Sequence, residues 1–353
     1  MSGGVDSSVA AALLVEQGYD VVGLFMRVGA HGTADDDNAV ESRRQGCCSA
    51  ADSADARRVA GRLDVPFYAL NFERDFDRLI DHFADEYTRG RTPNPCVVCN
   101  QDLKFGKVLR YADTVDAQYI ATGHYARITA HDNGPRLMRP RDPRKDQSYV
   151  LFGVDRAVLR RTLFPLGDLT KDQVRDIARD RGLANCDKPD SAEICFVPDR
   201  DYARVVRERR PDAARPGTVR DRDGNVVGTH DGIANFTVGQ RRGLGIAMGL
   251  PIYVTGLDAE TATVTVGDKQ DLLAGALRAS NVNWLVDPPA GPFRALAQIR
   301  YHHQAAPADV HHDGDGIEVR FDEPQSAITP GQAVVLYDNE TVLGGGWIES
   351  SPR

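Results

Sequence analysis

Two segments of this chain combine residue types that could carry out chemistry, and the first is a glycine- and serine-rich loop near the start. It reads SGGVDSS and runs directly into an apolar stretch, Val9 to Val15, that predicts a helix. Glycines have no Cβ, so their N–H groups can approach an anion closely, and a helix N-terminus adds unpaired N–H groups and a favourable dipole. We therefore expect a nucleotide phosphate site formed by Ser2, Gly3, Gly4, Val5, Asp6, Ser7 and Ser8.

Asp6 separates this loop from the common phosphate-binding loops. A Walker A loop ends in Gly-Lys-Ser or Gly-Lys-Thr, and that ending is absent here. A carboxylate beside phosphates suggests that Mg²⁺ supplies the counter-charge. The loop resembles the pyrophosphatase loop of enzymes that cleave ATP to AMP and pyrophosphate while they adenylate a carbonyl oxygen. The alternative is that the segment has no chemical role and is a turn that only caps the helix.

The second segment, TPNPCVVCN, holds Cys96 and Cys99 behind two prolines. Prolines favour an extended approach, and a helical turn that starts here would bring both cysteines to one face. Cys195, in DSAEICF, is a third candidate. Three cysteines could ligate a [4Fe–4S] cluster with one open iron, or two could do covalent sulfur chemistry while the third is idle. Both readings stay open at this point.

A reacting cysteine has to be a thiolate, so it needs nearby positive charge or a helix N-terminus. Lys104 and the start of its own helix are the candidate sources for the CxxC pair. The adjacent Cys47 and Cys48 lie in a polar loop at residues 29–48, and we expect them and Cys186 to be incidental.

The elements that must position these groups follow an alternating pattern in the first half of the chain. Short apolar runs at 21–26, 67–70 and 119–122 each come after a helical stretch, which is typical of βαβ units with a parallel sheet. Gly123 and His124 directly follow the third run, at the carboxyl end of a strand, where ligands bind in such sheets.

From about residue 205 the pattern changes to short β-like runs separated by turn residues. We predict three domains: an α/β catalytic domain at 1–204, a small β-rich domain at 205–272 and a β-barrel at 278–353. Strands of the barrel are expected at 293–301, 316–321, 333–337 and 342–347.

The composition of the chain limits the classes of protein to which it can belong. The chain has 353 residues, of which 41% are hydrophobic and 27% charged, as in soluble globular proteins. No apolar run approaches the ~20 residues of a membrane span, and the start shows no signal peptide, so we expect the cytoplasm. The net charge of −8 argues against non-specific binding of nucleic acid. An RNA site would therefore need local basic patches, for which the candidates are Arg89, Arg91, Lys104, Lys107 and Arg110; Arg139, Arg141, Arg144 and Lys145; Arg204, Arg207, Arg209 and Arg210; and Arg241 and Arg242.

Eight motifs in order over essentially the whole chain identify a family resemblance. They read SGGVDSS, GLFM, TPNPCVVCNQDLKF, YIATGHYAR, KDQSYVLF, DSAEICFV, FTVGQRRGLGI and TPGQAVVLYD. The chain resembles the tRNA-specific 2-thiouridylases, which replace the 2-oxygen of the wobble uridine with sulfur. The resemblance implies an ATP-pyrophosphatase α/β domain, a small central β domain and a C-terminal β-barrel. A base stacked in an anticodon loop has to be extruded to react.

The resemblance also implies the roles of individual residues. Cys99 would be the nucleophile and Cys195 the cysteine that carries a persulfide, supplied by a sulfur-donor protein, and a disulfide bond would belong to the chemistry. ATP would lie against Ser2–Ser8, Met26 and Gly123. The residues expected to meet tRNA are Asn94, Pro95 and Cys96, which would lie near the target base, and His124, Lys145, Asp146, Gln147, Arg300, Tyr301 and Gln332.

The chain departs from the family pattern at two points, and two other functions are alternatives. In the family a strand precedes the SGGVDSS loop, so we expect the natural start to lie upstream of Met1. Cys96 stands where some members have Asp, which keeps the cluster mechanism open beside the persulfide mechanism. Another adenylate-forming enzyme, such as an amide synthetase, would explain the loop but not the cysteines. A non-catalytic RNA-binding protein would explain only the basic patches.

Overall fold

The computed structural model describes residues 1–29, 50–190, 194–246 and 249–352, and its chain forms two compact units. Unit 1 comprises residues 1–78 and 98–200, and unit 2 comprises residues 79–97 and 201–353. Among the described helices, none combines the length and the apolar character that crossing a bilayer requires.

Unit 1 contains the parallel strands that the sequence predicts. Strand β1 (Gly23–Arg27) pairs in parallel with β2 (Phe67–Asn71), and β3 (Ile120–Ala121) pairs in parallel with β6 (Thr162–Leu163). A hairpin of β4 (Arg127–Thr129) and β5 (Arg136–Met138) follows β3. The predicted α/β class is therefore confirmed. The helices wholly within this unit, apart from short 3₁₀ turns at 143–145 and 148–151, are α1 (Val5–Glu16), α3 (Ala50–Arg62), η1 (Cys99–Lys107), α6 (Val108–Thr114), α7 (Arg156–Leu159) and α8 (Lys171–Asp180).

Packing between α1 and α8 positions the glycine–serine loop. Val5 and Val9 of α1 belong to one buried cluster with Val174 and Ala178 of α8. Burial of a valine side chain stabilises a fold by about 1.5–3 kcal/mol, so contacts among these three valines hold the two helices together. The loop before α1 and the first turn of α8 are thereby fixed as parts of one core.

The segment that starts at Cys99 departs from the ordinary helix that the sequence predicts. Residues Cys99–Lys107 form a π-helix, η1, and regular α-helix resumes only with α6. π-helical geometry is rare and concentrates at functional sites. Asn100 is buried there, and its Nδ2 donates to the carbonyl of Val150 at 2.9 Å.

The second segment of unit 2, from residue 201, starts with a helix and a small β module. The module has the strand order β8-β7-β10-β9, in which β7 and β10 run parallel and the other neighbours antiparallel. Its core consists of alternate inward side chains such as Val219, Val254 and Val264. The bounds are β7 (Gly217–Arg220), β8 (Val226–His230), β9 (Tyr253–Asp258) and β10 (Thr263–Gly267), preceded by α9 (Tyr202–Arg209), with 3₁₀ turns at 211–213, 233–235 and 270–272. The helices α4 (Glu73–Thr88) and α5 (Pro95–Val98) each cross from one unit into the other along the chain.

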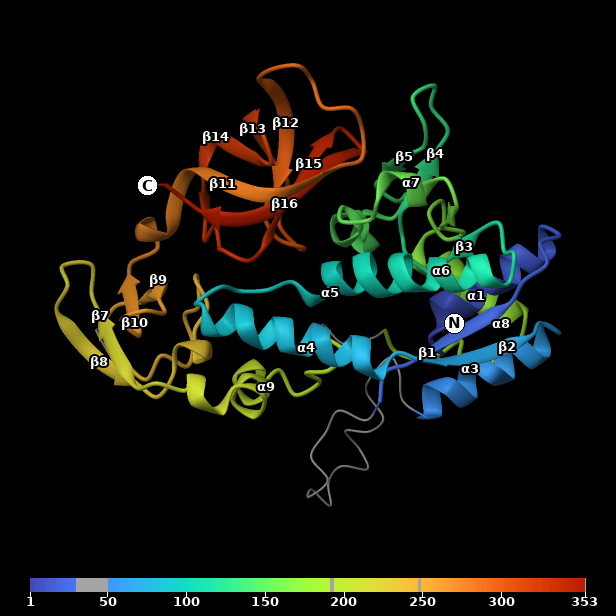
Figure 1. Cartoon of the computed structure of the whole chain (residues 1–353), viewed down its shortest axis with the longest axis horizontal. Coiled ribbons are helices and arrows are strands. Elements are labelled where there is room, and N and C mark those ends of the chain that lie inside the picture. The colour runs from blue at the N-terminus through green and yellow to red at the C-terminus, as the bar shows by residue number, and fades with distance from the viewer. Residues whose placement is uncertain (30–49, 191–193, 247–248, 353) are drawn as a thin grey trace. The chain divides into compact units, whose positions relative to one another are not determined.

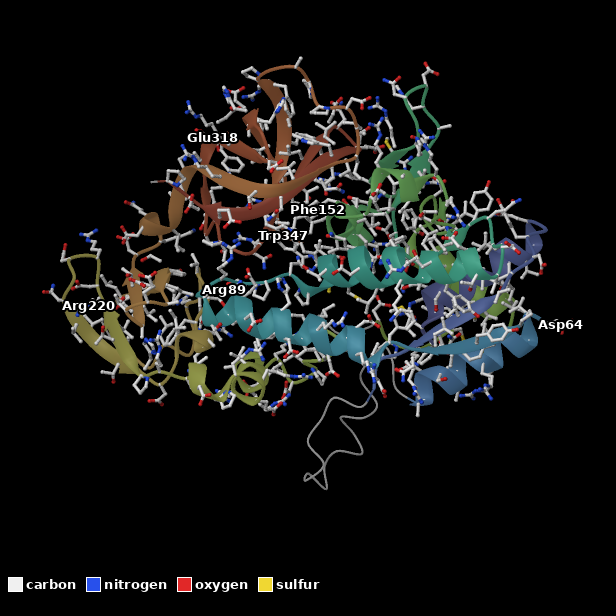
Figure 2. The ribbon with its side chains drawn as sticks, in the orientation of Figure 1. Asp64, Arg89, Phe152, Arg220, Glu318 and Trp347 are labelled. Atoms are coloured by element: carbon white, nitrogen blue, oxygen red, sulfur yellow. The ribbon has the colours of Figure 1, made fainter. Side chains whose placement is uncertain are left out.

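The last part of unit 2 is a closed six-stranded barrel, as predicted (Figure 1). The strand order is β11-β14-β13-β12-β15-β16, and pairing of β16 with β11 closes it. Figure 2 places Glu318 on β14 and Trp347 on β16. Two of the six strands, β11 and β13, were not predicted. The strands are β11 (Leu273–Trp284), β12 (Phe293–Gln298), β13 (Ala306–Asp313), β14 (Gly316–Ser326), β15 (Ala333–Asp338) and β16 (Thr341–Ser350).

Candidate active site

The glycine–serine loop precedes α1 and is closed by its own serines. Gly4 caps the helix in an extended conformation, and its carbonyl accepts from the Ser8 hydroxyl at 3.0 Å. The backbone N–H of Ser2 donates to Ser7 Oγ at 3.0 Å. The loop thus presents a helix N-terminus and small side chains, as the phosphate-site prediction requires.

Gly123 lies against this loop. A Cβ at Gly123 would lie 2.7 Å from the backbone nitrogen of Ser7, so only glycine permits this approach. The structure therefore brings together two segments that the sequence assigned to one site. Met26 lies on β1, the strand after α1.

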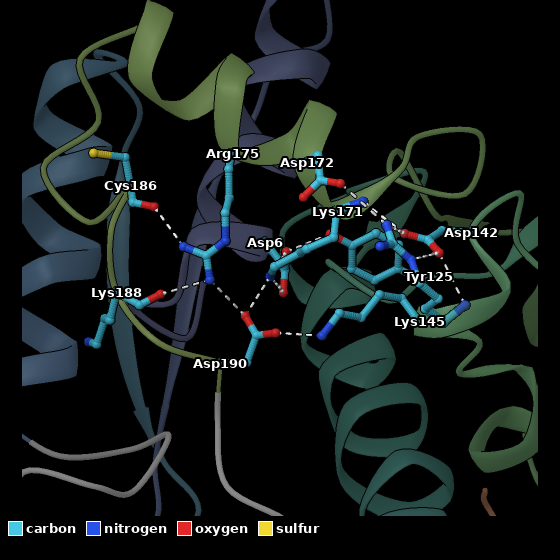
Figure 3. A network of polar contacts seen from close by, with 11 residues as sticks. Asp6, Tyr125, Asp142, Lys145, Lys171, Asp172, Arg175, Cys186, Lys188 and Asp190 are labelled. Carbon is cyan, nitrogen blue, oxygen red and sulfur yellow. Dashed lines mark hydrogen bonds and ion pairs between the residues drawn. The ribbon is translucent and has the colours of Figure 1, made fainter.

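Asp6 is compensated by a lysine that sequence reasoning missed. Both carboxylate oxygens accept from Lys171 Nζ, at 2.8 and 2.9 Å, and the Tyr125 hydroxyl donates to the same carboxylate at 2.8 Å (Figure 3). Burial and the Asp6 charge raise the pKa of Tyr125, so its hydroxyl stays protonated and donates. The inference of Mg²⁺ relied on a carboxylate without a cation beside it, and the fold supplies that cation.

Lys171 also meets Asp190, the first residue of the motif that contains Cys195. Its Nζ lies 2.7 Å from Asp190, which in addition pairs with Lys145 at 2.5 Å and Arg175 at 3.3 Å (Figure 3). Burial raises the pKa of Asp190, but hydrogen bonds and charges from Lys145 and Lys171 outweigh it and bring the pKa to about 2. Asp190 is therefore a stable anion that holds three cations near the loop.

The position of Lys171 is set by the start of α8. Thr170 caps this helix, and Thr170 and Gln173 form a reciprocal capping box. The backbone N–H of Lys171 donates to Asp142 at 3.1 Å, and the side chain is only 7% exposed. The Thr-x-x-Gln spacing predicts the start of this helix. No residue near it in the sequence indicates that Lys171 contacts Asp6.

Two further residues hold the loop from the segment after α8. Asn185 Nδ2 donates to the Gly3 carbonyl at 3.0 Å and to Ser8 Oγ at 2.9 Å. Since a carbonyl only accepts, this orientation of the amide is fixed, and Asn185 Oδ1 is left buried with no hydrogen-bond partner in the described part of the chain. Lys188 donates to the Gly3 carbonyl at 3.2 Å and pairs with Asp52 at 2.5 Å.

The Lys145–Gln147 motif, which is predicted to meet tRNA, contacts residues that surround Asp6. Gln147 Oε1 accepts from the backbone N–H of Tyr125 at 2.8 Å and so holds the main chain of the residue whose hydroxyl binds Asp6. Asp146 accepts from Arg139 and from the Ser148 hydroxyl. These side chains are thus committed to intramolecular contacts within unit 1.

His124, also predicted to meet tRNA, is buried in an aromatic cluster. Its ring lies 6.0 Å from that of Phe105 and 6.1 Å from that of Phe164, and Nδ1 is 2.7 Å from the Thr122 hydroxyl. Burial, with the charge of Lys104, lowers the pKa of His124 well below its ordinary value, so the ring is neutral. This setting favours a packing role over direct contact with RNA.

Comparison with known proteins identifies the family to which this chain is similar. Residues 1–199 match the tRNA methyl transferase HUP domain, residues 204–268 the tRNA methyl transferase PRC-barrel domain and residues 274–348 the aminomethyltransferase β-barrel domain. The chain is 47% identical to the tRNA-specific 2-thiouridylase MnmA of Clostridium perfringens, over 99% of this chain and 97% of that protein. The same protein of Geotalea uraniireducens is 50% identical, over 99% and 93%.

The chain belongs to the tRNA-specific 2-thiouridylase family. The resemblance read from eight motifs and the three-part fold it implied are thereby confirmed. The domain boundaries and the roles of individual residues stay predictions.

The cysteines of this family member occupy different settings. Cys99 starts the π-helix η1, and Cys195 follows the segment at 191–193 that the structure leaves undescribed. Cys96, Cys99, Cys186 and Cys195 are all partly exposed. Cys47 and Cys48 lie outside the described residues. Within the described ranges, no three His, Cys, Asp or Glu side chains are grouped so as to hold a metal ion.

Most of the basic side chains proposed as an RNA surface are paired with acids. Arg210 contacts Asp81 and Asp85, and Arg91 contacts Glu86. Arg300 donates to the carbonyls of Ser326 and Ala327, at 3.3 and 3.4 Å, and the Tyr301 ring packs on His302. In contrast, Arg110, Arg141, Arg241 and Arg242 are exposed, and none of them has an acidic partner in the part of the chain that the structure describes. They are the basic residues best placed to meet an anionic partner.

The low pKa of Asp190 leads to a testable pH dependence. The folded pKa of about 2 lies below the ordinary value of 3.8, so these ion pairs stabilise the fold fully above about pH 4. Their contribution is lost as the pH falls toward 2. We expect the difference in unfolding free energy between the wild type and Asp190→Asn, measured with urea, to be constant from about pH 5 to 7 and to shrink below about pH 4.

Asp176→Asn is the matched control, because Asp176 also pairs with an arginine but is 66% exposed on α8. We expect this variant to change stability by less than about 1 kcal/mol. A difference for Asp190→Asn that stays constant down to pH 3 would contradict the assigned ion pairs.

Proposed function

We propose that this chain uses ATP to replace the 2-oxygen of a uridine in tRNA with sulfur. The observation that carries the proposal is the similarity to tRNA-specific 2-thiouridylases over 99% of the chain. The loop before α1, compensated by Lys171, supplies the nucleotide chemistry that such a reaction needs. An amide synthetase of the same loop type would leave Cys99 and Cys195 without a role.

The first step is adenylation of the uridine. The 2-oxygen of uracil is a poor leaving group, so it attacks the α-phosphorus of ATP, and pyrophosphate departs. The phosphates would lie against Ser2–Ser8, with the nucleotide reaching Met26 and Gly123. Lys171 and Lys145 lie around Asp6 and Asp190, and cations at these positions favour a polyphosphate and the charge that develops during transfer.

Mg²⁺ is part of this proposal, since it commonly accompanies ATP and carboxylates bind it. Asp6 is the loop's carboxylate, and its side chain is 32% exposed. Its two oxygens are engaged by Lys171 and Tyr125, so the residues present compensate this charge without a metal. Bound with ATP, Mg²⁺ would offset phosphate charge, whereas Lys171 orients and neutralises Asp6.

The second step transfers sulfur. The terminal sulfur of a persulfide on Cys195 bonds to C2 of the adenylated base, and AMP leaves. The Cys99 thiolate then attacks the Cys195 sulfur, the S–S bond of the persulfide breaks, and its electron pair stays with the base as the thiocarbonyl forms. A Cys99–Cys195 disulfide results, which a dithiol reductant returns to two thiols.

The partners follow from the same proposal. The substrate would be the wobble uridine of the tRNA anticodon loop, extruded from its stack toward Asn94, Pro95 and Cys96. A donor protein that carries a persulfide would load Cys195, in the cytoplasm. Arg241 and Arg242 would add contacts to phosphate, which is consistent with their exposure.

The test is a reaction with purified full-length protein, tRNA, ATP and a persulfide donor. We expect 2-thiouridine by nucleoside mass spectrometry, with one AMP and one pyrophosphate formed for each thiolated base. If the protein instead converts ATP to AMP without tRNA while it consumes a small metabolite, the result would favour an amide synthetase.

Iron content separates the persulfide mechanism from the cluster mechanism. We expect protein purified without oxygen to contain no iron and Cys96→Ala to be mild, since Cys96 is then only a neighbour of the reacting thiols. About four irons per chain, activity with sulfide, and a loss in Cys96→Ala as severe as in Cys99→Ala would establish a [4Fe–4S] cluster on Cys96, Cys99 and Cys195.

A further inference from the structure

Gln332 lies in the barrel part of unit 2. Its side chain holds the segment that leads to Cys96 and Cys99. Its Nε2 donates to the Thr92 carbonyl at 2.9 Å and to the Pro93 carbonyl at 3.2 Å. Carbonyl oxygens only accept, so the orientation of the amide is fixed and both of its N–H donors are used. We call residues 91–97, which include Asn94, Pro95 and Cys96, the strap.

Backbone contacts reinforce this attachment. The N–H of Thr92 donates to the Pro330 carbonyl at 2.8 Å. Gly331 has a φ of +88°, and a Cβ there would lie 2.9 Å from the Thr92 nitrogen. Only glycine allows the turn at 330–332 to come so close to the strap. Gln332 is itself anchored, because its carbonyl accepts from the Ile348 N–H of β16 at 2.8 Å.

A charged side chain ties the start of the strap to the same barrel. Arg91 lies 2.5 Å from Glu349 of β16 and 2.7 Å from Glu86 of α4. Glu349 in turn accepts from the Ser280 hydroxyl of β11 at 2.6 Å. Arg89, just before the strap, lies where α4 ends (Figure 2). Side-chain and backbone contacts therefore converge on residues 91–93.

The strap is stiff beyond its attachment. Pro93 and Pro95 are buried and have restricted φ, and Asn94 Oδ1 accepts from the Val97 N–H at 3.4 Å at the first turn of α5. A displacement at Thr92 is thus passed along the segment instead of being absorbed.

We propose that Gln332 is a positioning residue, which holds the strap in the place where Asn94, Pro95 and Cys96 receive the target base. This inference rests on the proposed function for the role of the strap. It assigns the Gln332 amide to the protein's own backbone, whereas the family resemblance implied a contact with tRNA.

Hydrogen exchange of the full-length protein without tRNA tests the attachment directly. In Gln332→Ala we expect peptides that contain Thr92 and Val97 to exchange about tenfold faster, as loss of two hydrogen bonds predicts. Peptides of β15 and β16 should keep their protection, which shows that the barrel is intact. Gln332→Glu, which places an acceptor against two carbonyls, should accelerate exchange at least as much. Gln325→Ala is the matched control, because the Gln325 side chain donates to the nearby Glu323 carbonyl.

The functional half is tested by turnover and affinity together. We expect Gln332→Ala to lower the rate of 2-thiouridine formation about tenfold while the Kd for tRNA changes less than threefold. Unchanged exchange in the strap overturns the proposal, and so does faster exchange with unchanged turnover. A large loss of affinity with unchanged exchange would assign Gln332 to RNA contact. If the wild type forms no 2-thiouridine, the proposed function fails, while the exchange experiment still decides the role of Gln332 in holding the strap.

Discussion

Replacement of either Cys99 or Cys195 by serine is expected to abolish formation of 2-thiouridine and to leave tRNA affinity nearly unchanged. A serine hydroxyl cannot carry a persulfide, and at neutral pH it is a far weaker nucleophile than a thiolate. Neither change removes a charge that would hold RNA. Both cysteines are partly exposed, so substitution by the slightly smaller serine should cost little stability.

Single-turnover assays separate the two steps in these variants. We expect both to form the adenylate and release pyrophosphate, because the nucleotide site does not use the thiols. Cys186→Ser is the matched control: Cys186 is likewise partly exposed in unit 1, where it packs against the α1–α8 cluster and its sulfur lies near the neighbouring Asp187. It should retain thiolation, as should Cys47→Ser and Cys48→Ser. Substantial thiolation by Cys99→Ser or Cys195→Ser would refute the covalent role of that cysteine.

Lys171→Met is expected to lower the rate of AMP and pyrophosphate formation by about 100-fold or more. Loss of a preorganised group that stabilises developing charge typically has this effect. The substitution also leaves Asp6 and Asp190 without their shared cation. Removal of one partner from a buried ion pair costs about 3–5 kcal/mol, and the partial exposure of both carboxylates reduces this, so we expect a loss of about 1–3 kcal/mol.

A second substitution distinguishes chemistry from stability. Lys171→Met combined with Asp6→Asn removes the charge left on Asp6, so we expect part of the lost stability to return; adenylation is compared only between the wild type and the single variant, because Asp6 belongs to the nucleotide loop. Arg181→Met is the control, because Arg181 and Glu16 pair at the other ends of α8 and α1. It should lose some stability and keep adenylation. Near-normal pyrophosphate release by Lys171→Met would remove Lys171 from the nucleotide site.

The amino-acid sequence was sufficient for the features that depend on neighbours along the chain. The loop at Ser2–Ser8 predicted that a helix follows it, and α1 does follow, whereas its role as a phosphate site stays a prediction. Alternation of helical and apolar runs predicted parallel strands, and alternation of apolar residues at 293–347 predicted the barrel. The order of the motifs was enough for the family. Each of these signals resides within a few residues, so no knowledge of contacts was required.

Only the tertiary structure decided which side chains meet. Asp6 suggested Mg²⁺ because a carboxylate would lie beside phosphates, and only the packing of α1 on α8 shows that Lys171 contacts both of its oxygens. The predicted RNA contacts of Gln147 and Gln332 stay predictions, but only the fold shows that their amides bond to the backbone of Tyr125 and to the strap. A buried polar group has to find a partner, and that partner is set by distances that arise only when remote segments pack together.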